Sequence, residues 1–104
     1  MAARVIQLDA SKWRRPSDVD QALKVALGSP EGHGNGPDAW IEFMLNGRTN
    51  AASPPYRIEV AGTSQLNEAT LYYLLFIGVS VAYARLRKLV ERGVDTDVSI
   101  SVYP

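Results

Sequence analysis

The stretch from Gly28 to Gly47, GSPEGHGNGPDAWIEFMLNG, organises the rest of this chain. Its first part is rich in glycine and proline, which combine free and fixed backbone angles in the manner of a shaped loop. Proline is favoured at the first position of a helix, because its missing N–H has no intrahelical partner there in any case. The sequence therefore predicts a loop that leads into a helix from Pro37 to about residue 46.

The predicted helix has an apolar side and an acidic side. At 3.6 residues per turn, the apolar side carries Trp40, Phe43 and Met44, with Ile41 at its edge. The other side carries Asp38, Glu42 and Leu45. The two acidic residues are like charges at i,i+4, which costs about 0.2–0.5 kcal/mol on an isolated helix. No Lys or Arg lies between residues 31 and 47, so this side is either a solvated acidic surface or one that a partner neutralises.

The residues before this stretch predict a strand and then a helix. The aliphatic and β-branched run RVIQL, residues 4–8, predicts a strand that ends near Asp9. Ser17 is a suitable N-cap for a helix over residues 17–27, and Gly28 is placed to end it.

The residues after the stretch begin with a predicted irregular loop over residues 47–55. Alternation of apolar and polar residues then predicts strands over residues 56–61 and 97–103. Between them, residues 65–92 are compatible with helix. The candidate caps of this segment are Ser64 or Asn67 at its start and Gly93 at its end. Gly78 indicates a break into a helix pair, and the β-branched content of FIGVSVAY, residues 76–83, leaves a strand as the alternative there.

This order of elements predicts one α/β domain over residues 1–104, with a three-stranded, mainly parallel sheet packed by helices. A chain of 104 residues can form a single hydrophobic core without covalent cross-links. The absence of cysteine excludes disulfides and thiol catalysis. Together with a single histidine, it also excludes the usual zinc ligand sets, so we expect neither metal nor cofactor.

The charges balance overall but are placed unevenly. Eleven basic and eleven acidic residues give a net charge of zero, which offers no reason to expect direct binding of nucleic acid. One positive cluster consists of Lys12, Arg14 and Arg15. A second consists of Arg85, Arg87, Lys88 and Arg92, with only Glu91 opposing it in that run.

Residues 69–84 contain no charged side chain, but this stretch is shorter than the roughly 18 residues expected of a membrane span. Thr70, Ser80 and three tyrosines also count against a membrane span, so we predict a buried core segment and expect no membrane partner. The first fifteen residues carry Asp9 and four basic residues where a secretory signal needs a longer apolar run, so we expect a cytoplasmic protein. If residues 71–83 are more apolar than one small core can cover, the surplus surface should pair with a second copy, which predicts a homodimer.

Five segments of the chain carry a family resemblance. They are VIQL at 5–8, PSDVDQAL at 16–23, PEGHGNGPDAWIE at 30–42, PYRIEV at 55–60 and ERGVDTDVSISV at 91–102. Through them the chain resembles the barstar family, intracellular inhibitors of the ribonuclease barnase. The third segment is similar without a gap to the inhibitory segment of that family. The resemblance implies the barstar fold for nearly the whole chain, outside residues 47–55 and about 61–80.

The resemblance also implies a binding site. In barstar relatives, two acidic residues four apart insert toward the basic active site of the nuclease, and the matching residues here are Asp38 and Glu42. Carboxylates at this spacing can occupy the phosphate sites of a nuclease and pair with its basic groups. The loop that flanks them contributes Gly32, His33, Gly34, Asn35 and Gly36 to the implied surface.

Several contact positions depart from the family pattern. Gly32 stands where the family inhibitor has a contact tyrosine, and His33 takes the next aromatic place. Lys88 and Arg92 stand where the later helix of barstar offers acidic contacts, so the sign of the charge is reversed. A basic nuclease rim would repel them, which counts against barnase itself as the target.

Catalytic interpretations of the same residues are weaker. The segment GHGNG resembles a glycine-rich phosphate loop, but it follows a helix and precedes no lysine, so the dinucleotide and P-loop patterns fail. His33, Asp38 and Glu42 are chemically sufficient for general acid and base catalysis. Nothing in the sequence indicates the required geometry, and we expect no enzyme. The expected function is a barstar-like inhibitor or immunity protein that binds a nuclease or other toxin. The alternative is a barstar-fold interaction or self-association module without a nuclease target.

Overall fold

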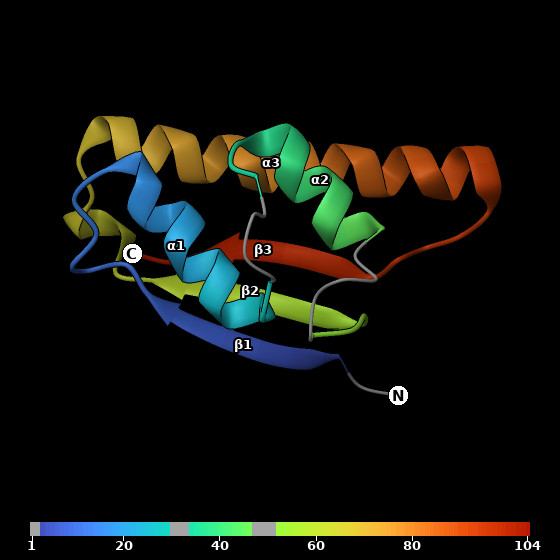
Figure 1. Ribbon diagram of the computed structural model, residues 1–104, viewed down its shortest axis with the longest axis horizontal. Helices are drawn as coiled ribbons and strands as arrows, with labels where there is room; N and C mark the ends of the chain where they lie inside the picture. The colour runs from blue at the N-terminus through green and yellow to red at the C-terminus, as the bar shows by residue number, and fades with distance from the viewer. Residues whose placement is uncertain (1–2, 30–33, 47–51) are drawn as a thin grey trace.

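In a computed structural model, the described residues form three strands and three α-helices in the order β1, α1, α2, β2, α3, β3 (Figure 1). The structure describes residues 3–29, 34–46 and 52–104. The strands are β1 (Arg4–Asp9), β2 (Tyr56–Ala61) and β3 (Val98–Val102), and the helices are α1 (Pro16–Leu27), α2 (Pro37–Leu45) and α3 (Glu68–Arg92). A short 3-10 turn, η1 (Thr63–Gln65), links β2 to α3. The predicted α/β class is confirmed.

The sheet has the strand order β1-β2-β3, and both strand pairs are parallel. Its register places Ile6 beside Ile58 and Ile58 beside Ile100. Side chains alternate along β2 between buried and more exposed positions, as the sequence pattern predicts. Figure 1 shows the helices gathered on one side of the sheet. The opposite side carries the exposed side chains of Val5 and Arg57, so this parallel sheet is covered on one face.

The hydrophobic core lies between the helices and the covered face of the sheet. Its helical members are Val19, Leu23 and Leu27 from α1, Trp40, Met44 and Leu45 from α2, and Leu74, Ile77 and Val81 from α3. The sheet adds Tyr56, Ile58, Val60 and Val98. Every helix therefore depends on this single core for most of its stability, because short helices are marginal by themselves.

The start of α1 differs from the prediction. Its N-cap is Arg15 and Pro16 opens its first turn, so Ser17 lies inside the helix and is not the cap. The carboxylate of Asp18 does the capping, since it accepts hydrogen bonds from the backbone nitrogens of Arg14 and Arg15 at 2.7 and 3.1 Å. These bonds, the one from Arg14 first, hold the pKa of the Asp18 carboxyl below its usual value.

Several other predicted helix ends are confirmed. α2 begins at Pro37, and α1 ends at Gly28, whose φ of 62° is left-handed. Of the two candidate caps of α3, the structure selects Asn67, because its Oδ1 accepts a hydrogen bond from the backbone nitrogen of Thr70 at 2.9 Å. Gly93 ends α3 with a φ of 68°. These ends are local features, which is why the sequence alone indicated them.

α3 is one continuous helix of 25 residues, so the predicted break at Gly78 and the alternative strand over residues 76–83 are both wrong. Gly78 faces β3, where an added Cβ would lie 3.9 Å from the carbonyl oxygen of Ile100. Packing of one side of α3 against the core outweighs the low helix propensity of glycine and of the β-branched residues around it.

Candidate protein-binding site

α2 presents its two acidic side chains away from the core. Asp38 and Glu42 are exposed, whereas Trp40 and Met44 on the other side are buried. Leu45, which was predicted to share the acidic side, is buried as well. It is the last residue of α2, where the helix lies against the C-terminal half of α3. The acidic side is therefore one turn shorter than predicted.

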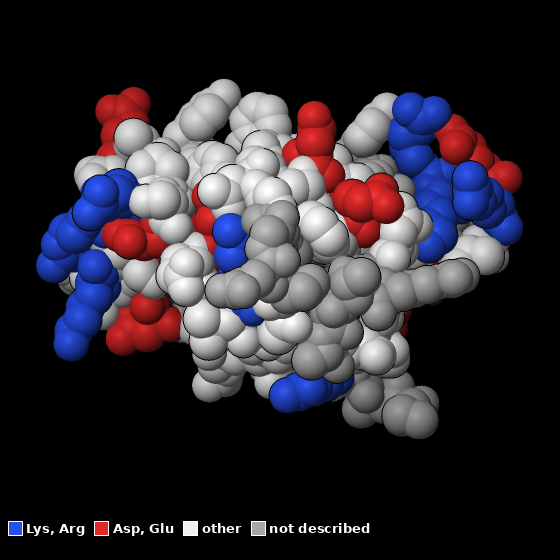
Figure 2. Space-filling model, viewed as in Figure 1, with Lys and Arg blue, Asp and Glu red and all other residues white. Residues whose placement is uncertain are grey.

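Figure 2 shows acidic side chains over α2 within largely uncharged surface, and basic side chains gathered over the C-terminal end of α3. The ion pairs within the described part of the chain join Arg85 to Asp95 and Asp97, and Arg87 to Glu91. Asp38 and Glu42 take part in none of them. The repulsion between these two carboxylates therefore has no compensating cation among the described residues.

A buried carboxylate holds α2 in place from its core side. Asp20 of α1 is 6% exposed, and its Oδ1 accepts a hydrogen bond of 2.7 Å from Nε1 of Trp40. The hydroxyl of Tyr73 on α3 donates to both oxygens of the same carboxylate, at 2.7 and 2.9 Å. Burial, followed by the bond to Asp20, raises the pKa of the Tyr73 hydroxyl. One side chain thus joins all three helices and sets the orientation of the acidic side.

Sequence reasoning missed Asp20, although a signal was present. It stands beside Val19 and three residues before Leu23, within the apolar stripe of α1. An acidic residue in such a stripe is buried when the fold supplies hydrogen-bond donors, because an unpaired buried charge is very costly.

The described loop residues support the start of α2. Gly34 and Asn35 are exposed, and Gly36 is the N-cap residue with a φ of 99°. A side chain at position 36 would strain this backbone, so the turn requires glycine there. Gly32 and His33, which were also predicted to belong to the site, lie outside the described residues.

Lys88 and Arg92 lie beside α2 as part of one hollow of about 390 Å³ between α2 and α3. The side chain of Lys88 is half-buried, and its Nζ donates hydrogen bonds to the carbonyl oxygen of Leu45 at 3.1 Å and to Oγ1 of Thr96 at 3.0 Å. Lys88 thus satisfies a carbonyl group at the C-terminal end of α2, a role the sequence did not indicate. Arg92 is exposed in the last turn of α3.

The second basic cluster is more strongly compensated than its sequence suggests. The guanidinium of Arg85 binds the carboxylate of Asp95 at 2.7 and 2.9 Å and that of Asp97 at 3.1 Å. Glu91 pairs with Arg87, so Asp95 and Asp97 oppose the cluster in addition to Glu91. The bond from Arg85, followed by one from the backbone nitrogen of Asp97, lowers the pKa of Asp95 to about 2.

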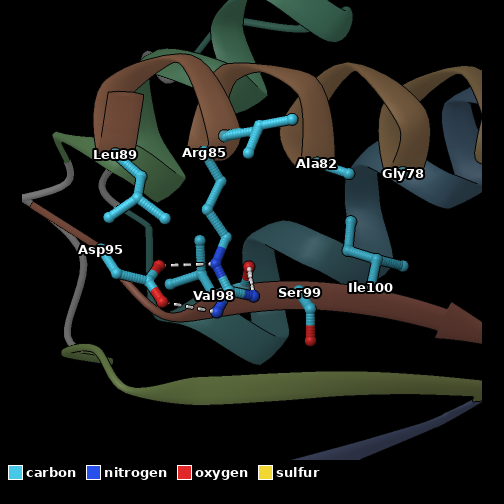
Figure 3. Close-up of a pocket in the computed structure, with 9 residues that line it drawn as sticks. Gly78, Ala82, Arg85, Leu89, Asp95, Val98, Ser99 and Ile100 are labelled. Carbon is cyan, nitrogen blue, oxygen red and sulfur yellow. Dashed lines mark hydrogen bonds and ion pairs between the residues drawn. The ribbon is translucent and has the colours of Figure 1, made fainter. Parts of the chain in front are cut away.

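Figure 3 shows a further hollow, between α3 and β3, with Arg85 reaching from α3 to Asp95. The rest of its lining is mostly apolar and includes Leu89, Val98 and Ile100. Arg85 and Asp95 neutralise each other, and the guanidinium also donates to the carbonyl oxygen of Val98 at 3.3 Å. This hollow therefore offers a ligand no uncompensated charge, and we assign it a role in holding the end of α3 to the sheet.

Comparison of the chain with models of protein families gives no match, and comparison with curated proteins also gives none. The resemblance to barstar therefore depends on the five quoted segments. Among the described residues, no group of three or more His, Cys, Asp or Glu side chains could hold a metal ion.

Proposed function

We propose that this chain is a barstar-like inhibitor or immunity protein, whose acidic side of α2 binds a cationic surface of a nuclease or other toxin. One observation carries the proposal. Asp38 and Glu42 stand one turn apart, exposed and without a cationic partner among the described residues, on a helix that Asp20 fixes through Trp40. A basic active site could bind two such carboxylates with little loss of conformational entropy, because the helix is already ordered.

The chain itself performs no reaction in this proposal. The carboxylates of Asp38 and Glu42 and the predicted loop residues only bind the partner, which is a protein in the cytoplasm. Direct contact with nucleic acid, a membrane or a cofactor is not part of the proposal.

The basic end of α3 restricts which targets fit. Arg92 is exposed there, in the hollow that separates α2 from α3. A target must therefore place positive charge over α2 and neutral or acidic surface over the end of α3. This requirement favours a target other than barnase.

Capture from the source cell followed by titration tests the site. Asp38→Ala and Glu42→Ala should each weaken binding of the captured protein by about 2 kcal/mol or more, mainly through faster dissociation. Glu68→Ala is the matched control, because Glu68 is also an exposed acidic residue, in the first turn of α3. If both α2 variants bind as tightly as the parent, α2 is not the binding site.

A second function has its own supporting observation. Several large apolar side chains of α3 are exposed, as expected of an interaction or self-association module without a nuclease target. Gene neighbourhood separates the two functions, since a toxin encoded beside this chain favours the inhibitor and an unrelated operon favours the module.

A further inference from the structure

α3 is apolar on two opposite sides. The inner side packs on the core through Thr70, Leu74, Ile77 and Val81. The outer side carries six large residues that are 47–76% exposed, and we call them the outer seam: Tyr72, Phe76, Val79, Tyr83, Leu86 and Val90. They are spaced alternately four and three residues apart, which is the heptad spacing of a coiled-coil interface. A helix that is apolar on both sides is normally covered on both sides.

The outer seam also contains a hollow that can receive one side chain of a neighbouring helix, and we call this hollow the socket. A hollow of about 340 Å³ is lined by Tyr72, Leu75, Phe76, Val79 and Ser80. The first four stand at positions i, i+3, i+4 and i+7, the four-residue arrangement that receives one side chain of a facing helix. The seam spacing and the socket both indicate that the missing neighbour is an α-helix.

We propose that the outer seam binds the outer seam of a second copy, with the two α3 helices antiparallel. A two-fold axis near residue 81 then uses every residue of the seam: Tyr72 faces Val90, Phe76 faces Leu86, and Val79 faces Tyr83 of the other copy. Leu86 of the second copy enters the socket around Phe76. Such an interface is isologous, so it closes at two copies. The proposal depends on α3 alone and is independent of any nuclease partner.

Charge favours the antiparallel direction. α3 begins with Glu68, and its last turns carry Arg87 and Arg92. Figure 2 shows basic side chains over the C-terminal end of α3, and both acidic and basic side chains at the end of the molecule where α3 begins. A parallel pair would bring the two basic ends together. An antiparallel pair places each basic end beside Glu68 in the first turn of the other α3 and also opposes the helix dipoles.

The exposed apolar area is sufficient for a stable dimer. Aromatic side chains such as those of Tyr72, Phe76 and Tyr83 present roughly 150–250 Å² each when fully free, and valine and leucine present less. At the exposed fractions observed, the six seam residues present several hundred Å² per copy, which is comparable to the roughly 800 Å² that one partner contributes to an interface of standard size.

A lipid bilayer is the competing neighbour. By length and composition alone α3 could cross a membrane, and 22% of its most apolar window is buried inside the fold. The inner side of α3, however, is already packed on the core. Binding to a bilayer requires only an apolar surface, whereas packing against a helix also requires heptad spacing and a hollow that receives a side chain. The outer seam has both of these features, so they favour a helix from a second copy.

The mass of the full chain in solution is the first test. Light scattering at micromolar concentration should give twice 11.4 kDa. Val79→Glu should raise the dissociation constant of the dimer by about 100-fold or more, because it places an unpaired charge in the seam. Val25→Glu is the matched control, since Val25 on α1 is 73% exposed and Val79 is 68% exposed. The control should remain a dimer, and circular dichroism should show both variants folded.

Cysteine cross-linking tests the direction, because the chain has no cysteine of its own. A mixture of Tyr72→Cys and Val90→Cys chains should form cross-links with a short thiol reagent. Each variant alone should form none, since identical residues at these positions would be about 27 Å apart along an antiparallel pair. The opposite pattern would show a parallel pair and overturn the proposed arrangement.

Three results would overturn the pairing itself. They are a parent mass of 11.4 kDa, equal dimerisation of the Val79→Glu and Val25→Glu variants, and binding of the monomeric parent to phosphatidylcholine and phosphatidylserine vesicles. The last result would assign the outer seam to a membrane.

Discussion

The indole Nε1 of Trp40 lies 2.7 Å from Oδ1 of Asp20, and this hydrogen bond joins α2 to α1 directly behind the acidic side of α2. Tyr73 binds the same carboxylate from α3. Since Asp38 and Glu42 stand on the opposite side of α2, the network holds them outward without touching them. The candidate site therefore has a buried support that is separate from its binding surface.

Asp20→Ala should lower the free energy of unfolding by about 3 kcal/mol, because it removes an acceptor that two donors share inside the protein. Tyr73→Phe removes one of the two donors and should cost about 1–2 kcal/mol. Urea denaturation measures both. A cost for Asp20→Ala no larger than that of the surface variant Asp38→Ala would contradict the supporting role.

Lys88 and Arg92 should respond differently to substitution. Lys88→Met removes the hydrogen bonds to Leu45 and Thr96 and should lower the free energy of unfolding by about 1–2 kcal/mol. Arg92 lies on the surface, so Arg92→Glu should change the free energy of unfolding by less than about 1 kcal/mol. Arg92→Glu is consequently the cleaner test of charge reversal, and stopped-flow mixing should show faster association with a basic nuclease. Unchanged stability of Lys88→Met would exclude the capping role.

The pair of Arg85 and Asp95 should contribute to stability in a defined pH range. The pKa of Asp95 is lowered from 3.8 to about 2, so the folded state binds this proton less tightly than the unfolded state. Its stabilising contribution is complete above a pH of about 4 and is lost as the pH falls toward about 2. Asp95→Asn should therefore make the free energy of unfolding less dependent on pH in that range. Arg85→Gln should do the same, and an unchanged pH profile in either variant would contradict this account.

Gly78→Ala should raise the free energy of unfolding by about 0.5–1 kcal/mol, since alanine favours the helical state. Its Cβ would meet Ile100 at 3.9–4.0 Å, which is ordinary contact distance. Gly36→Ala is the contrasting change, because its φ of 99° strains any side chain although no atom obstructs it. That variant should lose about 1 kcal/mol or more. Thermal unfolding compares the two, and a loss of stability in Gly78→Ala would show that α3 and β3 are packed too closely for a methyl group.

The sequence by itself determined the types and order of the elements outside the segment around Gly78, together with several helix ends. Alternation along residues 56–60 and 98–102 and the local chemistry of Pro37 and Gly93 were sufficient, because these signals act between residues close in the chain. The sequence also indicated that Asp38 and Glu42 share one side of a helix, since helical geometry alone decides that.

Only the tertiary structure decided what these elements meet. α3 continues through Gly78 because its inner side packs on the core, Asp20 is buried because donors arrive from two other helices, and Lys88 caps α2 because the end of α2 lies beside α3. The exposure of the outer seam is a result of the same kind, since the sequence shows only that residues 69–84 are uncharged, and packing decides which of them the core covers. Each of these outcomes depends on contacts between residues distant in sequence, and folding alone brings those residues together.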